Sequence, residues 1–238
     1  MKLDILAFGA HPDDVELGCS ATIAKEISLG KKVGIVDLTR GELGTRGSAD
    51  LRDKEAAIAA DILGVSVREN LSFADGFFIN DKKHQLEVVK MIRKYKPEIV
   101  LCNAINDRHI DHPKGSELVS NACFLSGLLK IETHLDGKMQ EKWRPKQVYH
   151  YIQWKNIKPD FVVDVTGFID KKIASVKAYS SQFFDPGSNE PETPITSKNF
   201  TDSIEYRARD LGRLINVGFA EGFTSERYVA IENLSKLI

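Results

Sequence analysis

Short apolar runs alternate with longer amphipathic stretches along most of this chain. Residues 5–9 form a continuous apolar run that is soon followed by Pro and two acids, a pattern typical of a buried strand that ends in a turn. In residues 15–28, apolar side chains recur at helical spacing from Leu17 to Ile27, and Gly30 follows as a stop signal. The chain is therefore predicted to open with a strand, a turn and a helix.

The same alternation continues towards the C-terminus. The expected strands are residues 5–9, 32–38, 70–73, 99–103, 147–152, 161–165 and 228–232. The expected helices are residues 15–28, 49–63, 86–95, 112–130, 168–180 and 202–217. Strands that alternate with helices of ten or more residues favour a parallel sheet with right-handed crossovers. We therefore expect an α/β fold, a Rossmann-like three-layer sandwich with a mostly parallel sheet.

Two segments are predicted to be loops. Residues 40–47 are rich in Gly and follow an expected strand, which indicates a mobile loop. Residues 185–198 contain Pro186, Pro191 and Pro194 and are the most loop-like part of the sequence. Because long loops in folded domains often cover active sites, this second segment is a candidate flap.

Composition narrows the class of protein. The 238 residues lie within the size of one large domain, so we expect residues 1–238 to form a single domain. The net charge of −1 gives no reason to expect nucleic acid or an anionic membrane as a partner. The apolar run after Met1 is too short for a signal peptide or a membrane span. Three cysteines without CxxC spacing are expected to be reduced thiols, and we expect a cytoplasmic protein.

Two polar clusters follow two of the expected strands. Residues 11–14 (His-Pro-Asp-Asp) come after the strand at 5–9, and residues 109–112 (His-Ile-Asp-His) come after the strand at 99–103. In an open parallel sheet, ligands bind at the carboxyl ends of the strands, particularly where the strand order reverses. The two clusters are therefore expected to face each other across one crevice.

The clusters contain enough ligands for a metal ion. His11, Asp14, His109 and His112 offer imidazole and carboxylate groups that suit Zn²⁺, and three protein ligands plus water is the pattern of a catalytic zinc site. A purely structural zinc site usually includes Cys, and no cysteine neighbours either cluster. The residue types alone do not select three ligands among these four.

The paired acids suggest a division of roles. Adjacent side chains in a non-helical turn point in different directions, so one of Asp13 and Asp14 can bind the metal while the other accepts a proton from water as a general base. Alternatively, the pair caps the helix expected to begin near Val15. Both interpretations stay open on position alone.

Three classes of function other than deacetylation of an amino sugar are weighed for these clusters. The chain could hydrolyse a different amide or ester, or it could be a metal-binding module without activity. A nucleotide-binding enzyme is compatible with the fold class, but no GxGxxG or GxxxxGK[ST] motif follows the first strand, where two acids would repel phosphate.

At the two clusters the sequence resembles the PIG-L/LmbE family of metal-dependent N-acetyl-sugar deacetylases. The resemblance also covers residues 39–47, Arg52, Glu55, residues 75–76, 181–182 and 220–223. Within the family the chain is most similar to the bacillithiol-biosynthesis deacetylases, which act on N-acetylglucosaminyl malate. The resemblance implies an LmbE-like fold, a small-molecule amino-sugar substrate and a homo-oligomer.

The resemblance also assigns a metal-ligand set, drawn from both clusters, and a general base. It implies that His11, Asp14 and His112 bind the metal and that Asp13 is the general base. The metal is expected to be Zn²⁺, and Fe²⁺ is also compatible, because His and Asp accept both.

In the second cluster, the resemblance implies that His109 stabilises the oxyanion or protonates the leaving amine, with Asp111 as its orienting partner. The sequence departs from the commonest family pattern at two positions. Ile110 stands where many members have Pro, and Tyr179 stands where many have His. The second difference leaves the role of position 179 open.

Four further residues are candidates for substrate binding. Arg52 and Arg108 could hold an anionic aglycone such as malate, because a guanidinium fork matches a carboxylate. Asp75 and Glu42 could accept hydrogen bonds from sugar hydroxyls, and they could equally cap loops.

Overall fold

A computed structural model describes residues 1–233 and 235 of the chain. The strands are β1 (Ile5–Gly9), β2 (Val33–Thr39), β3 (Val67–Phe73), β4 (Ile99–Cys102), β5 (His134–Leu135), β6 (Lys138–Met139), β7 (Gln147–Tyr151), β8 (Phe161–Asp164) and β9 (Ala220–Ser225). The helices are α1 (Asp14–Ser28), α2 (Ala49–Leu63), α3 (Lys82–Tyr95), α4 (Asp111–Ser126), α5 (Ile169–Lys177) and α6 (Lys198–Arg213).

The main sheet has seven strands in the order β3-β2-β1-β4-β7-β9-β8. The first five of these are mutually parallel, and β9 runs antiparallel to both β7 and β8. From β1 the chain builds outward to β3 and then returns to the other side of β1 as β4. The strand order therefore reverses between β1 and β4, which is the position where open α/β sheets bind ligands.

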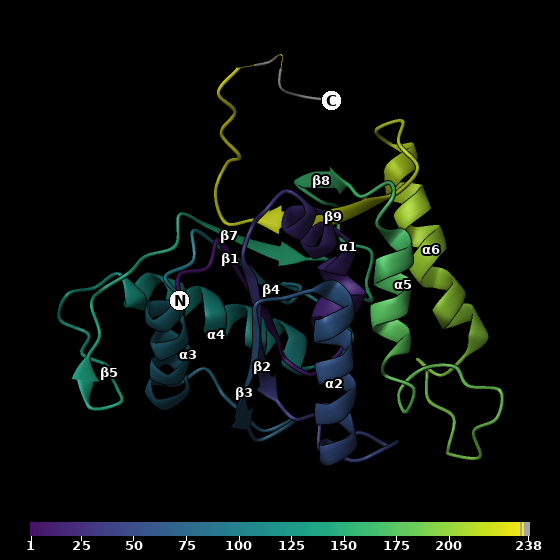
Figure 1. Ribbon diagram of the computed structural model, residues 1–238, viewed down its shortest axis with the longest axis horizontal. Coiled ribbons are helices and arrows are strands. Elements are labelled where there is room, and N and C mark those ends of the chain that lie inside the picture. The colour runs from purple at the N-terminus through teal and green to yellow at the C-terminus, as the bar shows by residue number, and fades with distance from the viewer. Residues whose placement is uncertain (234, 236–238) are drawn as a thin grey trace.

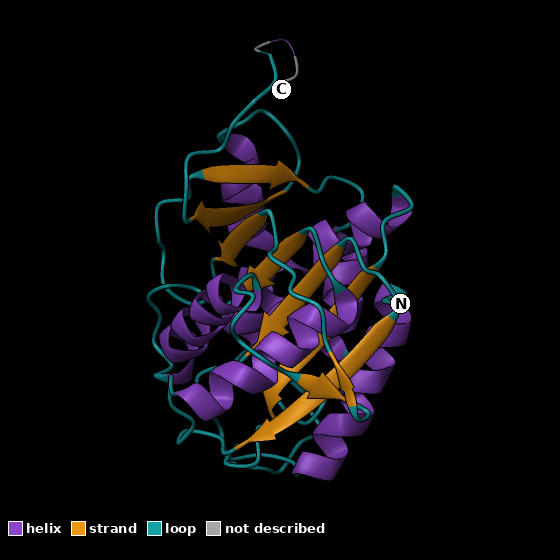
Figure 2. Ribbon diagram, turned by 90° about the vertical axis from the view of Figure 1, so that its left-hand side faces the viewer, coloured by secondary structure: helices purple, strands orange, loops and turns teal. Residues whose placement is uncertain are grey.

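Helices cover both faces of this sheet, as Figures 1 and 2 show. Side chains of β1 alternate between the two faces: Leu6 and Phe8 belong to a core with residues of α3 and α4, whereas Ile5 and Ala7 belong to a core with residues of α1. A third cluster joins α2, α5 and α6. A parallel strand that is buried on both faces consists of a continuous run of apolar residues, as β1 does. The predicted α/β sandwich is confirmed.

Helix α1 is not regular along its whole length. At Cys19 the backbone leaves the helical region, with φ −147° and ψ 18°. The carboxylate of Glu221 in β9 accepts hydrogen bonds from the backbone N–H groups of Ala21 (3.2 Å) and Thr22 (2.7 Å), and so caps the second half of the helix. A buried ion pair with Lys172, at 2.5 Å, completes the contacts of Glu221. Strand β9 thus fixes the bend of α1.

Several predicted boundaries were wrong. Residues 228–232 were expected to form the last strand, but they are exposed and form neither strand nor helix. The last strand is β9 instead. Helix α6 begins at Lys198 rather than at 202, because Ser197 caps it by accepting a hydrogen bond from the backbone N–H of Phe200. Helix α4 ends at Ser126, four residues before the expected end.

The short hairpin of β5 and β6 was not predicted. Asp136 and Gly137 connect its strands, with φ values of 50° and 74°. An Asp-Gly pair with positive φ at both positions is the usual two-residue hairpin turn. The sequence signal was therefore present. In the described part of the chain, no helix is long and apolar enough to cross a membrane.

Candidate metal centre and cavity

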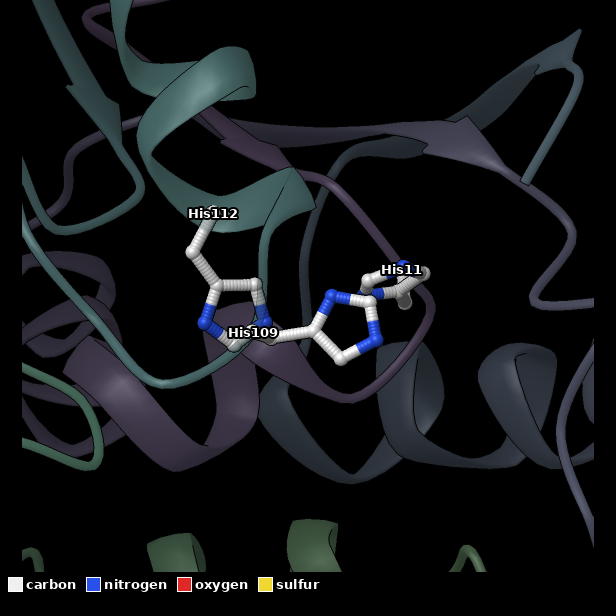
Figure 3. Close-up of side chains that lie close together, drawn as sticks. All are labelled: His11, His109 and His112. Carbon is white, nitrogen blue, oxygen red and sulfur yellow. The ribbon is translucent and has the colours of Figure 1, made fainter. Parts of the chain in front are cut away.

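The two polar clusters meet at the reversal point between β1 and β4. His11 lies in the loop after β1, His109 lies in the turn before α4, and His112 lies in the first turn of α4. Figure 3 shows the three imidazoles converging from these elements. Each ring offers one nitrogen within 4.8 Å of the others. The crevice expected from the strand ends is therefore present.

Asp14 lies between two of these histidines. Its Oδ2 is 3.4 Å from Nδ1 of His11, and its Oδ1 is 3.0 Å from Nε2 of His112. Asn103 and Gln153 donate side-chain hydrogen bonds to the same carboxylate, at 3.0 and 2.8 Å. These two hydrogen bonds, one to each oxygen, fix the orientation of the Asp14 carboxylate.

Both of these histidines also contact carboxylates through their other nitrogen. Nδ1 of His112 is 2.5 Å from Asp107. Nε2 of His11 is 3.0 Å from Asp75 and 3.4 Å from Asp111. A carboxylate on the far nitrogen is typical of metal-binding histidines, because it orients the ring and increases its basicity. His11 and His112 share this feature.

Among the described residues, no carboxylate forms a hydrogen bond or ion pair with the ring of His109. Its Nδ1 accepts a hydrogen bond from the backbone N–H of Asp111, at 3.3 Å. The Asp111 carboxylate, expected to orient His109, instead contacts His11, the backbone N–H of Gly76 (2.7 Å) and Lys114 (2.9 Å). Because Nδ1 is an acceptor, this hydrogen bond assigns the proton of the neutral ring to Nε2.

The carboxylate of Asp13 has a different partner from that of Asp14. Its backbone has φ 116°, an unfavourable value for a residue other than Gly, and its side chain makes no helix-capping hydrogen bond. The carboxylate is instead 2.9 Å from a guanidinium nitrogen of Arg52. Arg52 also donates to the carbonyl oxygens of Pro12 and Gly41. The positive φ of Gly41 and its missing Cβ leave room for this guanidinium.

Burial and charge shift the pKa values of the two acids in opposite directions. Burial raises the pKa of Asp13 to about 7, and the charge of Arg52 limits the rise. Burial also acts to raise the pKa of Asp14, but the neighbouring His112 and His11 outweigh it and hold this pKa well below its ordinary value. Asp14 therefore stays ionised.

The pKa values of the three histidines also shift in different directions. Burial disfavours charge on His112, but Asp14 and Asp107 outweigh it and raise its pKa to about 9. Burial likewise opposes charge on His11, and hydrogen bonds to Asp111, Asp14 and Asp75 outweigh it and raise its pKa. For His109, burial and the neighbouring histidines lower the pKa together, so this ring stays neutral.

A divalent cation fits this donor set. Asp14 is an ionised carboxylate between two imidazoles, and it favours protonation of both rings. A bound metal ion would supply this positive charge in place of the protons. Two histidines and one carboxylate leave a position for water, as in catalytic zinc sites. The cluster is thus able to hold a metal.

The site opens into a cavity of about 490 Å³. Its lining includes the three histidines, Asp13, Asp14, Arg52, Asp75, Arg108 and residues of α6. Glu42 is exposed and does not line the cavity; its carboxylate caps a loop by accepting from the backbone N–H of Asp75, at 2.8 Å. Tyr179 is buried away from the cavity, where its hydroxyl donates to Glu16 at 3.2 Å.

Three residues that support the cluster were not predicted from the sequence. Asn103 and Asp107 follow β4, and Gln153 follows β7, the next strand of the parallel sheet. The available signal was a polar residue soon after an apolar run: Asn103 directly follows β4, Asp107 follows it by five residues, and Gln153 follows β7 by two. The neighbouring position of β7 and β4, which brings Gln153 to Asp14, is a property of the fold.

Comparisons with known proteins support this description. A model of the PIG-L family, described as GlcNAc-PI de-N-acetylase, matches residues 6–123. The conserved protein TT1542 from Thermus thermophilus has a TM-score of 0.88 and 34% identity, over 99% of this chain and 100% of that chain. The uncharacterized deacetylase YaiS of Escherichia coli is 40% identical over 114 residues, which are 45% of this chain and 61% of that protein.

Two further relatives match most of the chain. Diacetylchitobiose deacetylase from Thermococcus kodakarensis is 28% identical over 75% of this chain and 70% of its own length. The 4-oxalmesaconate hydratase of Pseudomonas putida is 27% identical over 74% of this chain and 73% of its own length. The matched family model spans both polar clusters, and the same fold extends over the whole of a relative at 34% identity. This chain belongs to the PIG-L family.

Proposed function

We propose that the chain is a metal-dependent N-deacetylase that hydrolyses the acetamide of an N-acetylated sugar conjugate. One observation supports this proposal: the neighbouring acids and histidines of the site have different partners. Asp14 contacts His11 and His112, Asp13 pairs with Arg52, and the Nδ1 of His109 accepts a hydrogen bond from the backbone. Relatives named as deacetylases, one of them acting on diacetylchitobiose, support the reaction class.

His11, Asp14 and His112 would hold the ion, which we propose to be Zn²⁺, with Fe²⁺ also suited to these donors. When bound, the ion would supply Lewis-acid polarisation of the acetamide carbonyl and a more acidic water. Asn103 and Gln153 keep the Asp14 carboxylate in place for this role.

The remaining steps belong to side chains outside the ligand set. Asp13, held by Arg52, takes a proton from the attacking water as the water adds to the carbonyl carbon. His109 donates its Nε2–H to the oxygen that becomes negative in the tetrahedral intermediate. The C–N bond then breaks, and the amine leaves with the proton that the general base received.

For the substrate, we propose N-acetylglucosaminyl malate. The support is the sequence resemblance to deacetylases of bacillithiol biosynthesis, together with arginines that line the cavity beside the candidate metal centre. A cytoplasmic location, a single domain over residues 1–238 and a homo-oligomeric state belong to the same proposal. Neither nucleic acid nor a membrane is part of it.

The test is an assay of free amine. Zinc-loaded protein is incubated in parallel with N-acetylglucosaminyl malate, N-acetylglucosamine and diacetylchitobiose, and the primary amine released is measured. We expect release from at least one substrate, with the malate conjugate the best. His112→Ala serves as the control without the metal. If no substrate releases amine from metal-loaded protein, deacetylation is excluded, and a hydration of the kind catalysed by the Pseudomonas relative becomes the next reaction to assay.

A further inference from the structure

Two arginines differ from all the others in the described part of the chain. Nine of the eleven arginines donate side-chain hydrogen bonds, to carboxylates, carbonyl oxygens, a hydroxyl or a side-chain amide. The guanidinium groups of Arg108 and Arg207 have no hydrogen-bond or ion-pair partner among the described residues. Both of these arginines line the cavity that contains the candidate metal centre.

The two residues come from different elements that meet at one aromatic ring. Arg108 precedes α4, and its guanidinium lies over the ring of Trp154, 4.7 Å from the centroid. Phe200 of α6 stacks on the same ring, with centroids 5.4 Å apart. Arg207 lies two turns further along α6 and reaches the same cavity. Trp154 thus connects the two elements that carry the free guanidinium groups.

Arg207 is partly buried without a partner. Burial lowers its pKa, and Asp107 is the acid that counteracts this effect. Both carboxylate oxygens of Asp107 are already engaged, one by His112 (2.5 Å) and the other by the backbone N–H of Lys155 (3.0 Å). A guanidinium withdrawn from water without a counter-ion costs free energy, and a bound anion would remove that cost.

Arg52 cannot perform the same task. Its guanidinium is engaged by Asp13 and by the carbonyl oxygens of Pro12 and Gly41. A substrate carboxylate that paired with Arg52 would compete with Asp13. Arg52 is therefore a positioning residue for the general base, in contrast to its expected role as an anion ligand.

We infer that Arg207, together with Arg108, binds a carboxylate on the aglycone of the N-acetylated sugar conjugate. This inference rests on the proposed function and assigns the specificity of that site. The sugar places its acetamide at the candidate metal centre, and the aglycone extends along the cavity towards α6. A forked, charge-assisted pair with guanidinium then selects conjugates with an anionic aglycone over neutral glycosides.

The test compares two substrates that differ in the aglycone charge. For wild type, Arg207→Gln and Arg108→Gln, kcat/KM is measured on N-acetylglucosaminyl malate and on the neutral methyl glycoside of N-acetylglucosamine. We expect the preference for the malate conjugate to fall by about 10- to 100-fold in each variant. Arg207→Lys, which keeps the charge without the fork, should lose part of the preference. Arg213→Gln changes an exposed arginine of the same helix and is the matched control.

Calorimetry on metal-free protein adds a readout without turnover. Binding of N-acetylglucosaminyl malate should weaken by a similar factor in Arg207→Gln, and binding of the methyl glycoside should not weaken by that factor. Equal losses on both ligands, or no loss on either, would overturn the inference. A wild-type enzyme that deacetylates both substrates equally well also overturns it while leaving the proposed function intact. A wild type that deacetylates neither of these substrates nor diacetylchitobiose refutes the proposed function itself.

Discussion

Adjacent aspartates have opposite environments in this molecule. The carboxylate of Asp14 contacts His11 and His112, whereas that of Asp13 contacts Arg52. The positive φ of Asp13 turns the two side chains apart, at a cost of about 1–3 kcal/mol that the surrounding contacts must offset. This backbone conformation is what makes a separate ligand and a separate base available from two consecutive residues.

Asp13→Asn is the residue-scale prediction for the general base. An amide cannot accept a proton from water, so we expect kcat to fall by about 10²- to 10⁴-fold. Bound metal, measured by elemental analysis, should stay at the wild-type level, because Asp13 does not contact the proposed ligand histidines. An Asn variant with normal turnover would contradict the assignment.

His112→Ala is the complementary variant for the ligand set. It removes the imidazole that contacts Asp14 at 3.0 Å, and we expect the variant to lose bound metal as well as activity. Unchanged metal content in His112→Ala would remove this residue from the ligand set.

His109→Ala should instead keep the metal and lose about 10²- to 10³-fold in turnover, as expected for one oxyanion donor.

At the scale of elements, the sequence predicts those parts of the fold that local pattern controls. β1 and β4 are buried apolar runs that end in polar residues, so their positions and the metal cluster at their ends could both be predicted. Strand β9 could not. Its sequence, residues 220–225, includes Glu and Gly, and Glu221 is buried because it caps α1 from another part of the fold. Residues 228–232 have a strand-like composition without a neighbouring strand to pair with among the described residues.

The contacts that support Asp14 also depend on the tertiary fold, so they could not be predicted from local sequence. Asn103 and Gln153 act on Asp14 only because β4 and β7 are neighbours in the sheet. Arg207 reaches the cavity because α6 packs beside β9, and nothing in its local sequence indicates this. Conversely, Arg52 has a residue type suited to anion binding, but its environment pairs it with Asp13. The type of a residue indicates which interactions its side chain can make, and the tertiary fold decides which of them it does make.

His150 of β7 contacts α4 and the residue that follows β9, and its Nδ1 also lies 3.2 Å from the carbonyl oxygen of Asn103. Its Nδ1 is 2.7 Å from the hydroxyl of Ser116 and its Nε2 is 3.1 Å from Glu226. Burial opposes charge on the ring, but interactions with Cys102 and Glu226 outweigh it and raise the pKa of His150 to about 10. An unfolded histidine has a pKa of about 6.5. The stabilisation is therefore complete below pH about 6.5 and is lost as the pH rises through about 10.

His150→Gln should accordingly lower the free energy of unfolding by about 1 kcal/mol near pH 6.5, a small value because Glu226 is 39% exposed. The difference from wild type should shrink as the pH rises from about 6.5 to about 10. Urea unfolding at several pH values measures both quantities. His134→Gln, at an exposed histidine of β5, is the control. A destabilisation that does not change with pH would mean that packing rather than charge explains the effect.

At the scale of the whole molecule, the candidate metal centre connects segments that are distant in sequence. The loop after β1 and the first turn of α4 are about a hundred residues apart, and they lie together only in the folded state. The unfolded chain does not hold His11, Asp14 and His112 in one place. A metal that binds them therefore stabilises the native state selectively.

Metal removal should consequently lower the thermal stability of the whole domain. At a free metal concentration about 100 times Kd, binding adds about 2.7 kcal/mol, and a chain of this size gains roughly 2–4 °C in Tm per kcal/mol. We expect Tm to fall by about 5–10 °C when the protein is stripped with a chelator, and to recover on addition of Zn²⁺. His112→Ala should show the same Tm with and without metal, because its ligand set is incomplete. If wild type and His112→Ala respond equally to Zn²⁺, the stabilising ion does not need His112 and binds elsewhere, for example at the neighbouring group of His11, Asp75 and Asp111.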